Sequence, residues 1–277
     1  MTSSRASLAR GLNRLARQPS TELESLQRLW PAVRKQVERK RRHLLRAIPK
    51  DDPIRLQVDL LGPIKCASDE TLHTQALAYA MDPQTGHQLA KHVVLSLLEF
   101  LRSKYPRSGA ARVLRTARKA GARISVEPEY RYRVEGFRHK SAARSDIWIE
   151  IQGAKRSAVM VLENKIKAAE SDGQLSWYER KAAAWCKARG HNRFLLIFLS
   201  REGQAATTYE KRRWVALSYL ELASVLRKVW VEARPALGAQ WLALYVASIM
   251  HGVLGINLKR HENFNLVDVQ AYLGRRR

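Results

Sequence analysis

The sequence predicts an α/β protein: an α/β/α sandwich with a central mixed sheet, preceded by a basic helical extension at the N-terminus. Three observations predict it. Helical and strand patterns alternate along most of the chain. The apolar run 194–199 is typical of a strand buried on both faces. The chain has 277 residues, 45% of them hydrophobic, which is enough for one large domain with an appendage.

Residues 1–50 are predicted to form the basic extension and residues 51–277 the second domain. The first 50 residues contain 13 basic and 3 acidic side chains, a net charge of +10. Apolar residues recur at helical spacing from Thr21 to Arg46, and Thr21 with Glu24 forms a capping box. Prolines and aspartates in 48–53 interrupt this pattern and predict the boundary. The extension is either an arm that binds nucleic acid or a docked helix with a solvated basic face.

The next part of the chain is predicted to contain three helices followed by two short strands. Asp69 and Glu70 begin the first helix, and the proline and glycine of 81–86 form the turn that ends it. β-Branched and aromatic residues indicate the strands. The predicted helices cover 69–79, 87–101 and 107–119, and the predicted strands 123–126 and 130–132.

Strands and helices alternate from residue 145 onward. Ser218 and Glu221 form a capping box for the helix that follows the last strand, and Pro235 precedes the final long helix. The predicted strands cover 145–151, 159–165, 194–199 and 214–217, and the predicted helices 171–189, a segment from 218, and 236–253.

The strands 145–151 and 159–165 contain the residues that could bind a metal ion or take part in catalysis. The turn between them permits a hairpin, which brings Asp146 to the same end as Glu163 and Lys165. Residues i and i+2 of a strand share a face, so Glu163 and Lys165 project together and Asn164 projects away. The two carboxylates can bind Mg²⁺, with the carbonyl of Asn164 as a further ligand. Lys165 can orient or deprotonate a water and offset charge on a phosphate.

These motifs resemble those of the PD-(D/E)xK nuclease superfamily, in the branch with RxD, ExK and QxxxY motifs. The resemblance covers about residues 65 to 220, and Ser145 stands where the superfamily name has proline, which removes no ligand. Further similarity includes His73 and His87, whose ordinary role would be packing or capping. The matching segments are 144–147, 163–166, 174–178, 70–73, 77–83 and 86–87.

The resemblance implies a restriction-endonuclease-like fold and a metal-dependent nuclease. It implies that Asp146 and Glu163 are metal ligands and that Lys165 is the catalytic lysine. Glu70 would be the acid of the first core helix, which faces the metal directly or through water. Gln174 and Tyr178, four residues apart on one helix face, would support the site or contact nucleic acid. The implied cofactor is Mg²⁺, with Mn²⁺ as a substitute.

The charge of the chain indicates a polyanionic partner. Fifty Lys and Arg stand against 25 Asp and Glu, a formal net charge of +25. Nucleic acid is the expected partner, DNA before RNA, and an anionic membrane surface is the rival.

No apolar run is long enough to span a bilayer, and the two cysteines form no metal or disulfide pattern. A cytoplasmic location follows, with the first twenty residues interpreted as a basic tail in preference to a transit peptide.

Two alternatives to an active nuclease remain open. The chain could be a catalytically silent nucleic-acid-binding module, or an effector subunit that a protein partner or a second copy activates through the N-terminal helix. Restriction or anti-phage defence is suggested by the resemblance alone.

A basic stretch could form a phosphate-binding groove or a solvated face; its residues are Arg102, Lys104, Arg107, Arg112, Arg115, Arg118 and Lys119.

Overall fold

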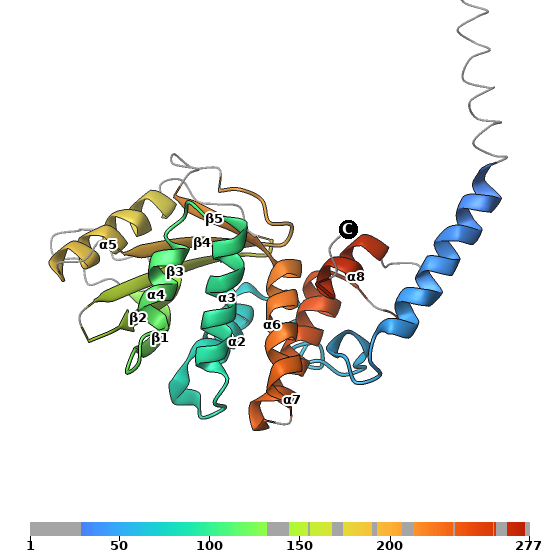
Figure 1. The fold of residues 1–277 in the computed structure, drawn as a ribbon, viewed down its shortest axis with the longest axis horizontal. Helices are drawn as coiled ribbons and strands as arrows, with labels where there is room; N and C mark the ends of the chain where they lie inside the picture. Colours follow the sequence, from blue (N-terminus) through green and yellow to red (C-terminus); the bar gives the residue numbers. More distant parts are fainter. Residues whose placement is uncertain are drawn as a thin grey trace, which may run out of the picture. The chain divides into compact units, whose positions relative to one another are not determined.

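The computed structural model of the chain divides into two compact units, Met1–Lys50 and Asp51–Arg277 (Figure 1). In the first unit, residues 29–47 are helical, and the earlier part of the predicted 21–46 helix lies outside the described residues. The structure describes residues 29–131, 144–154, 156–167, 174–189, 193–206, 213–234, 236–256, 258 and 265–274.

The second unit is built on a five-stranded mixed sheet with strand order β1-β2-β3-β4-β5. The first three strands form an antiparallel meander, and β3, β4 and β5 run parallel. β2 to β5 begin and end within two residues of their predicted bounds. β1 is one continuous strand where two short strands were predicted. The strands are β1 (Arg123–Arg131), β2 (Arg144–Gln152), β3 (Ser157–Lys165), β4 (Phe194–Ser200) and β5 (Trp214–Ser218).

Helices cover both faces of this sheet, as the α/β/α prediction requires (Figure 1). One face packs against α5 (Gln174–Ala188) through a core that includes Trp148, Val161 and Tyr178. The helices of the other face are α2 (Glu70–Met81), α3 (Ala90–Lys104) and α4 (Ala110–Ala117). The predicted fold class is therefore confirmed. Neighbouring residues of β3 point alternately toward these two layers, which places the site described below.

The chain after β5 is mainly helical. α6 (Tyr219–Ala233) begins with the predicted capping box of Ser218 and Glu221, and it packs against α3 and α7 (Leu237–Ser248). The predicted 236–253 helix continues from α7 as a π-helical segment, η3 (Ile249–Val253). No helix in the described ranges is long and apolar enough to cross a membrane. Three short elements were not predicted: η1 (Pro53–Arg55), η2 (Pro83–Thr85) and α8 (Leu266–Tyr272).

Two of the differences from the predicted boundaries have local explanations. The helix predicted from residue 87 begins at Ala90, because Gln88 has a left-handed backbone with φ of 62°. Pro128 does not divide β1, since β1 lies at the edge of the sheet and a proline there removes no interior ladder hydrogen bond.

A buried ion pair ties the start of the second unit to its C-terminal helices. Asp52 is fully buried, and its Oδ2 accepts hydrogen bonds from Arg227 Nε at 2.8 Å and Nη2 at 2.7 Å. Its Oδ1 accepts from the Tyr272 hydroxyl at 2.8 Å and from the backbone N–H of Ile54 at 3.3 Å. One carboxylate thereby joins η1, α6 and α8.

Replacing this carboxylate should destabilise the protein strongly. Asp52→Asn leaves the Arg227 guanidinium without its buried counter-charge, and we expect the free energy of unfolding to fall by about 3 to 5 kcal/mol. The matched control is Asp51→Asn, because the Asp51 side chain is 62% exposed and its ion pair with Arg234 lies at the surface. That change should cost less than about 1 kcal/mol. Urea denaturation measures both, and equal effects would contradict a central role for Asp52.

Candidate active site

The register of β2 against β3 determines which residues meet at the open end of the hairpin. Ile147 pairs with Leu162, so Asp146 and Glu163 form the next position of the same ladder. Asp146 Oδ2 accepts a hydrogen bond from the backbone N–H of Asn164 at 2.7 Å. Asp146 therefore lies beside Glu163, as the predicted hairpin requires.

Glu163 lies at the centre of a small buried polar cluster. Its side chain is 0% exposed, and Oε1 contacts Lys165 Nζ at 2.7 Å and accepts from Gln174 Nε2 at 2.9 Å. Gln174 Nε2 also donates to the Tyr178 hydroxyl at 2.7 Å, so α5 supplies both support residues. The other carboxylate oxygen, Glu163 Oε2, is buried and has no hydrogen-bond partner within the described part of the chain.

The electrostatics of the cluster reflect its burial. Burial is the largest cause that raises the pKa of Glu163, and the nearby charge of Asp146 is the next. Lys165 opposes both, and the net result is a pKa of about 8. Burial alone would lower the pKa of Lys165, but attraction by Glu163 outweighs burial and the pKa is raised. The ammonium group is consequently charged at neutral pH, whereas the raised pKa of Glu163 shows that its ionised form is disfavoured beside Asp146.

Asn164 points to the opposite layer, as the strand alternation predicts. Its side chain is 1% exposed, and its Nδ2 donates to Glu70 O and Thr74 Oγ1, both at 3.1 Å. Its Oδ1 accepts from the Tyr219 hydroxyl at 2.7 Å. These bonds fix the side chain between α2 and α6, so only the main-chain carbonyl of Asn164 could serve as the predicted ligand.

Glu70 lies near the cluster but is engaged by the backbone. Its Oε1 accepts hydrogen bonds from the N–H groups of Ile166 at 2.9 Å and Lys167 at 2.8 Å, just beyond β3. Within the described ranges, no group of three or more His, Cys, Asp or Glu side chains is arranged to hold a metal ion. Asp146 is thus the carboxylate that acts directly on Glu163, while Glu70 holds, through Oε1, the chain that leaves β3.

Comparison with known families agrees with this geometry. Residues 58–246 match the family model described as the PD-(D/E)XK nuclease superfamily. The chain belongs to this superfamily. The matched segment runs from before α2 into α7 and contains the whole sheet, and with it every candidate site residue. Searches of curated proteins and of solved structures gave no match.

The acidic pair of this superfamily member fits a divalent cation. Glu163 Oε2 is a buried oxygen next to a second carboxylate, and no described residue forms a hydrogen bond with it. Such oxygens are the ligands that Mg²⁺ and Mn²⁺ prefer, and a bound cation would relieve the repulsion between the carboxylates. The residues that would hold it are Asp146 and Glu163, together with the main-chain carbonyl of Asn164.

Two residues that help to position the site were not predicted from the sequence. Thr74 lies one helical turn after Glu70, so the spacing of α2 could have indicated it. Tyr219 is distant in sequence, and no local signal identifies it. The two matching histidines are packed: His73 Nε2 contacts Ala67 O at 3.1 Å, and His87 Nε2 contacts Tyr79 O at 2.8 Å.

Removal of the Tyr219 hydroxyl tests the support beneath Asn164. Tyr219→Phe leaves the buried Asn164 Oδ1 without its hydrogen bond, and we expect the free energy of unfolding to fall by about 1 to 3 kcal/mol. Tyr105→Phe is the control, because that hydroxyl donates to Ala216 O in a partly exposed position and its loss should cost about 0.5 to 1.5 kcal/mol. Urea denaturation of both variants provides the comparison. A smaller effect at Tyr219 would contradict its role.

Proposed function

We propose that this superfamily member is a Mg²⁺-dependent nuclease that hydrolyses phosphodiester bonds, with DNA as the expected substrate and Mn²⁺ as a substitute metal. The observation that carries the proposal is the buried carboxyl group of Glu163 next to the partly buried carboxylate of Asp146, beside the charged Lys165. A bound divalent cation would supply a Lewis acid and positive charge at the phosphate.

The protein side chains have separate tasks in this proposal. Asp146 and Glu163 would hold the cation through their carboxylate oxygens. Lys165 contributes a fixed positive charge that orients the attacking water and offsets charge developing on the phosphate. Gln174 donates to Glu163 and keeps the carboxylate in one rotamer, and Tyr178 accepts from Gln174 in turn.

The charge of the chain supports nucleic acid as the substrate class. A net charge of +25 attracts a polyanion from a distance and raises its local concentration. The acidic pair contrasts with the positive net charge of the chain. This combination is expected where a divalent cation and a phosphate must both bind. A role in restriction or anti-phage defence is part of the proposal by analogy with other members of the superfamily.

Substitution of the acidic pair tests the proposed chemistry. Glu163→Gln and Asp146→Asn each remove one carboxylate with little change of volume, and we expect cleavage to slow by at least about a hundredfold. Glu150→Gln is the control, since Glu150 lies on the same hairpin and contacts Trp148 Nε1 at 3.1 Å, away from the site. Cleavage of DNA and RNA, each single- and double-stranded, is measured with Mg²⁺ and with Mn²⁺. Undiminished cleavage by both site variants would reject the assignment.

Gln174 is expected to act by positioning Glu163. Gln174→Ala should lower kcat by about 10- to 100-fold and leave KM for the nucleic acid nearly unchanged, because the substrate-binding surface remains. Lys187→Ala, at an exposed position near the other end of α5, is the control. An increase in KM with constant kcat would instead identify Gln174 as a substrate-binding residue.

A further inference from the structure

A cluster of four arginines lies at the end of the sheet opposite to the acidic pair. β3 and β4 are parallel and therefore begin at the same end, and two of the arginines directly precede them. Glu163 follows seven residues further along β3, a distance of roughly 23 Å at the rise of a β-strand. The cluster consists of Arg112 and Arg115 on α4, Arg156 before β3 and Arg193 before β4.

Contacts around Thr116 hold these segments together. Arg193 Nη1 donates to Thr116 Oγ1 at 3.4 Å, and Arg193 O accepts from the backbone N–H of Val159 at 3.0 Å. The β2–β3 turn is closed by a hydrogen bond from Gly153 N–H to Arg156 O at 2.9 Å. A Cβ on Gly153 would lie 3.7 Å from Thr116 Cγ2, so this turn packs against α4. The arginines thus project from rigid neighbouring elements.

The described residues provide no acidic ion-pair partner for the positive charge of this cluster. Among the described residues, none of the four arginines forms an ion pair with an acid. The pKa of Arg193 is lowered by partial burial and then by the charges of Arg156, Arg115 and Arg112. The fold therefore brings together like charges that repel one another.

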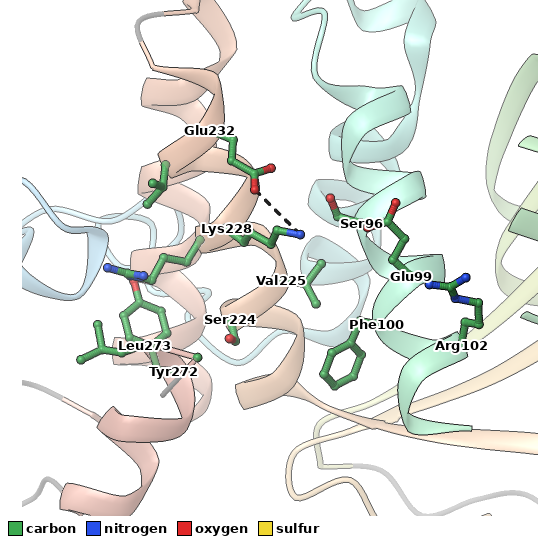
Figure 2. A pocket seen from close by; sticks show the side chains of 13 residues that line it. Ser96, Glu99, Phe100, Arg102, Ser224, Val225, Lys228, Glu232, Tyr272 and Leu273 are labelled. Atoms are coloured by element: carbon green, nitrogen blue, oxygen red, sulfur yellow. Dashed lines mark ion pairs between the residues drawn. The ribbon is translucent and has the colours of Figure 1, made fainter. Parts of the chain in front are cut away.

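Basic residues elsewhere on α3, α4 and α6 contrast with this cluster. Lys104 pairs with Glu221 at 2.5 Å, and Arg118, the C-cap residue of α4, pairs with Glu99 at 2.5 Å. Glu99 also lines a cavity of about 540 Å³ between α3, α6 and α8, with Lys228 and Glu232 3.8 Å apart (Figure 2). Within the basic stretch 102–119, acids therefore neutralise Lys104 and Arg118, whereas Arg112 and Arg115 belong to the cluster.

We propose that Arg112, Arg115, Arg156 and Arg193 bind the phosphodiester backbone of nucleic acid, at an anchoring surface separate from the acidic pair. Guanidinium groups donate paired hydrogen bonds to phosphate oxygens, and a phosphate would offset the repulsion within the cluster. Phosphate contacts contain no base readout, so binding here is independent of sequence. The choice of nucleic acid as partner rests on the proposed function.

Equilibrium binding in EDTA tests this surface without cleavage. Arg115→Gln, Arg156→Gln and Arg193→Gln are combined in the full chain, and fluorescence anisotropy follows a labelled DNA duplex of about 30 base pairs at roughly 50 to 200 mM salt. We expect the affinity to fall by about tenfold or more and the salt slope, log K against log [salt], to become shallower by roughly 2 to 3.

The control variant removes the same amount of charge where the described structure places acids nearby. It combines Arg102→Gln, Arg118→Gln and Lys228→Gln, and its affinity should stay within about threefold of wild type. The lysine version of the cluster, with Arg115, Arg156 and Arg193 each changed to Lys, should retain most of the salt slope. The lysine version keeps the positive charge, so it separates the effect of lost charge on binding from an effect of the substitutions on folding. Thermal melting of each variant measures the effect on folding.

The outcomes distinguish this proposal from the proposed function. Equal affinities and slopes for the glutamine cluster variant and the control would reject the anchoring surface, even if the wild-type protein cleaves DNA. Loss of binding in the cluster variant would support the surface, even if the wild-type protein cleaves nothing. Failure of the wild-type protein to bind DNA or RNA, or stronger binding to phosphatidylserine vesicles than to duplex, would also reject it.

Discussion

The antiparallel register between β2 and β3 is the constraint on which the site depends. Pairing of Ile147 with Leu162 places Asp146 next to Glu163, and a shift of one residue would turn one of these carboxylates to the other face of the sheet. Buried apolar residues on both sides of the hairpin resist such a shift, because any slip would expose them. At the site itself, the hydrogen bond from Asn164 N–H to Asp146 fixes the same register. Core packing and candidate chemistry therefore share one structural determinant.

Alternation along β3 gives three consecutive residues two different structural roles. Glu163 and Lys165 face α5, where Gln174 supports the carboxylate, while Asn164 faces α2 and α6 and is anchored by Thr74 and Tyr219. The anchoring side chain thus prevents the strand end from rotating. Burial of Glu163 beside a second carboxylate opposes folding unless a positive charge is near. Lys165 supplies part of that charge, and the unpartnered oxygen of Glu163 indicates where a cation would supply the rest.

The sequence was most informative where the structure depends on local patterns. The strands, the capping box of Ser218 and Glu221, and the meeting of Asp146 with Glu163 follow from residue spacing, and the superfamily and the fold class are confirmed. Contacts between distant segments could not be predicted: spacing does not indicate that Tyr219 reaches Asn164 or that Glu70 accepts from the backbone after β3. The basic stretch shows the same limit, since only the fold determines which arginines meet acids. Arg144 belongs to the motif prediction, but its side chain lies outside the described residues. Residues 171–173, the start of the predicted 171–189 helix, also lie outside them.

The central claim is that Asp146 and Glu163 form one divalent-cation site. Isothermal titration of Mn²⁺ into the wild-type protein and into the Asp146→Asn, Glu163→Gln double variant measures this directly. The account predicts a binding event in the wild-type protein that is absent from the double variant and preserved in Glu150→Gln. Identical titrations of the wild type and the double variant would contradict it.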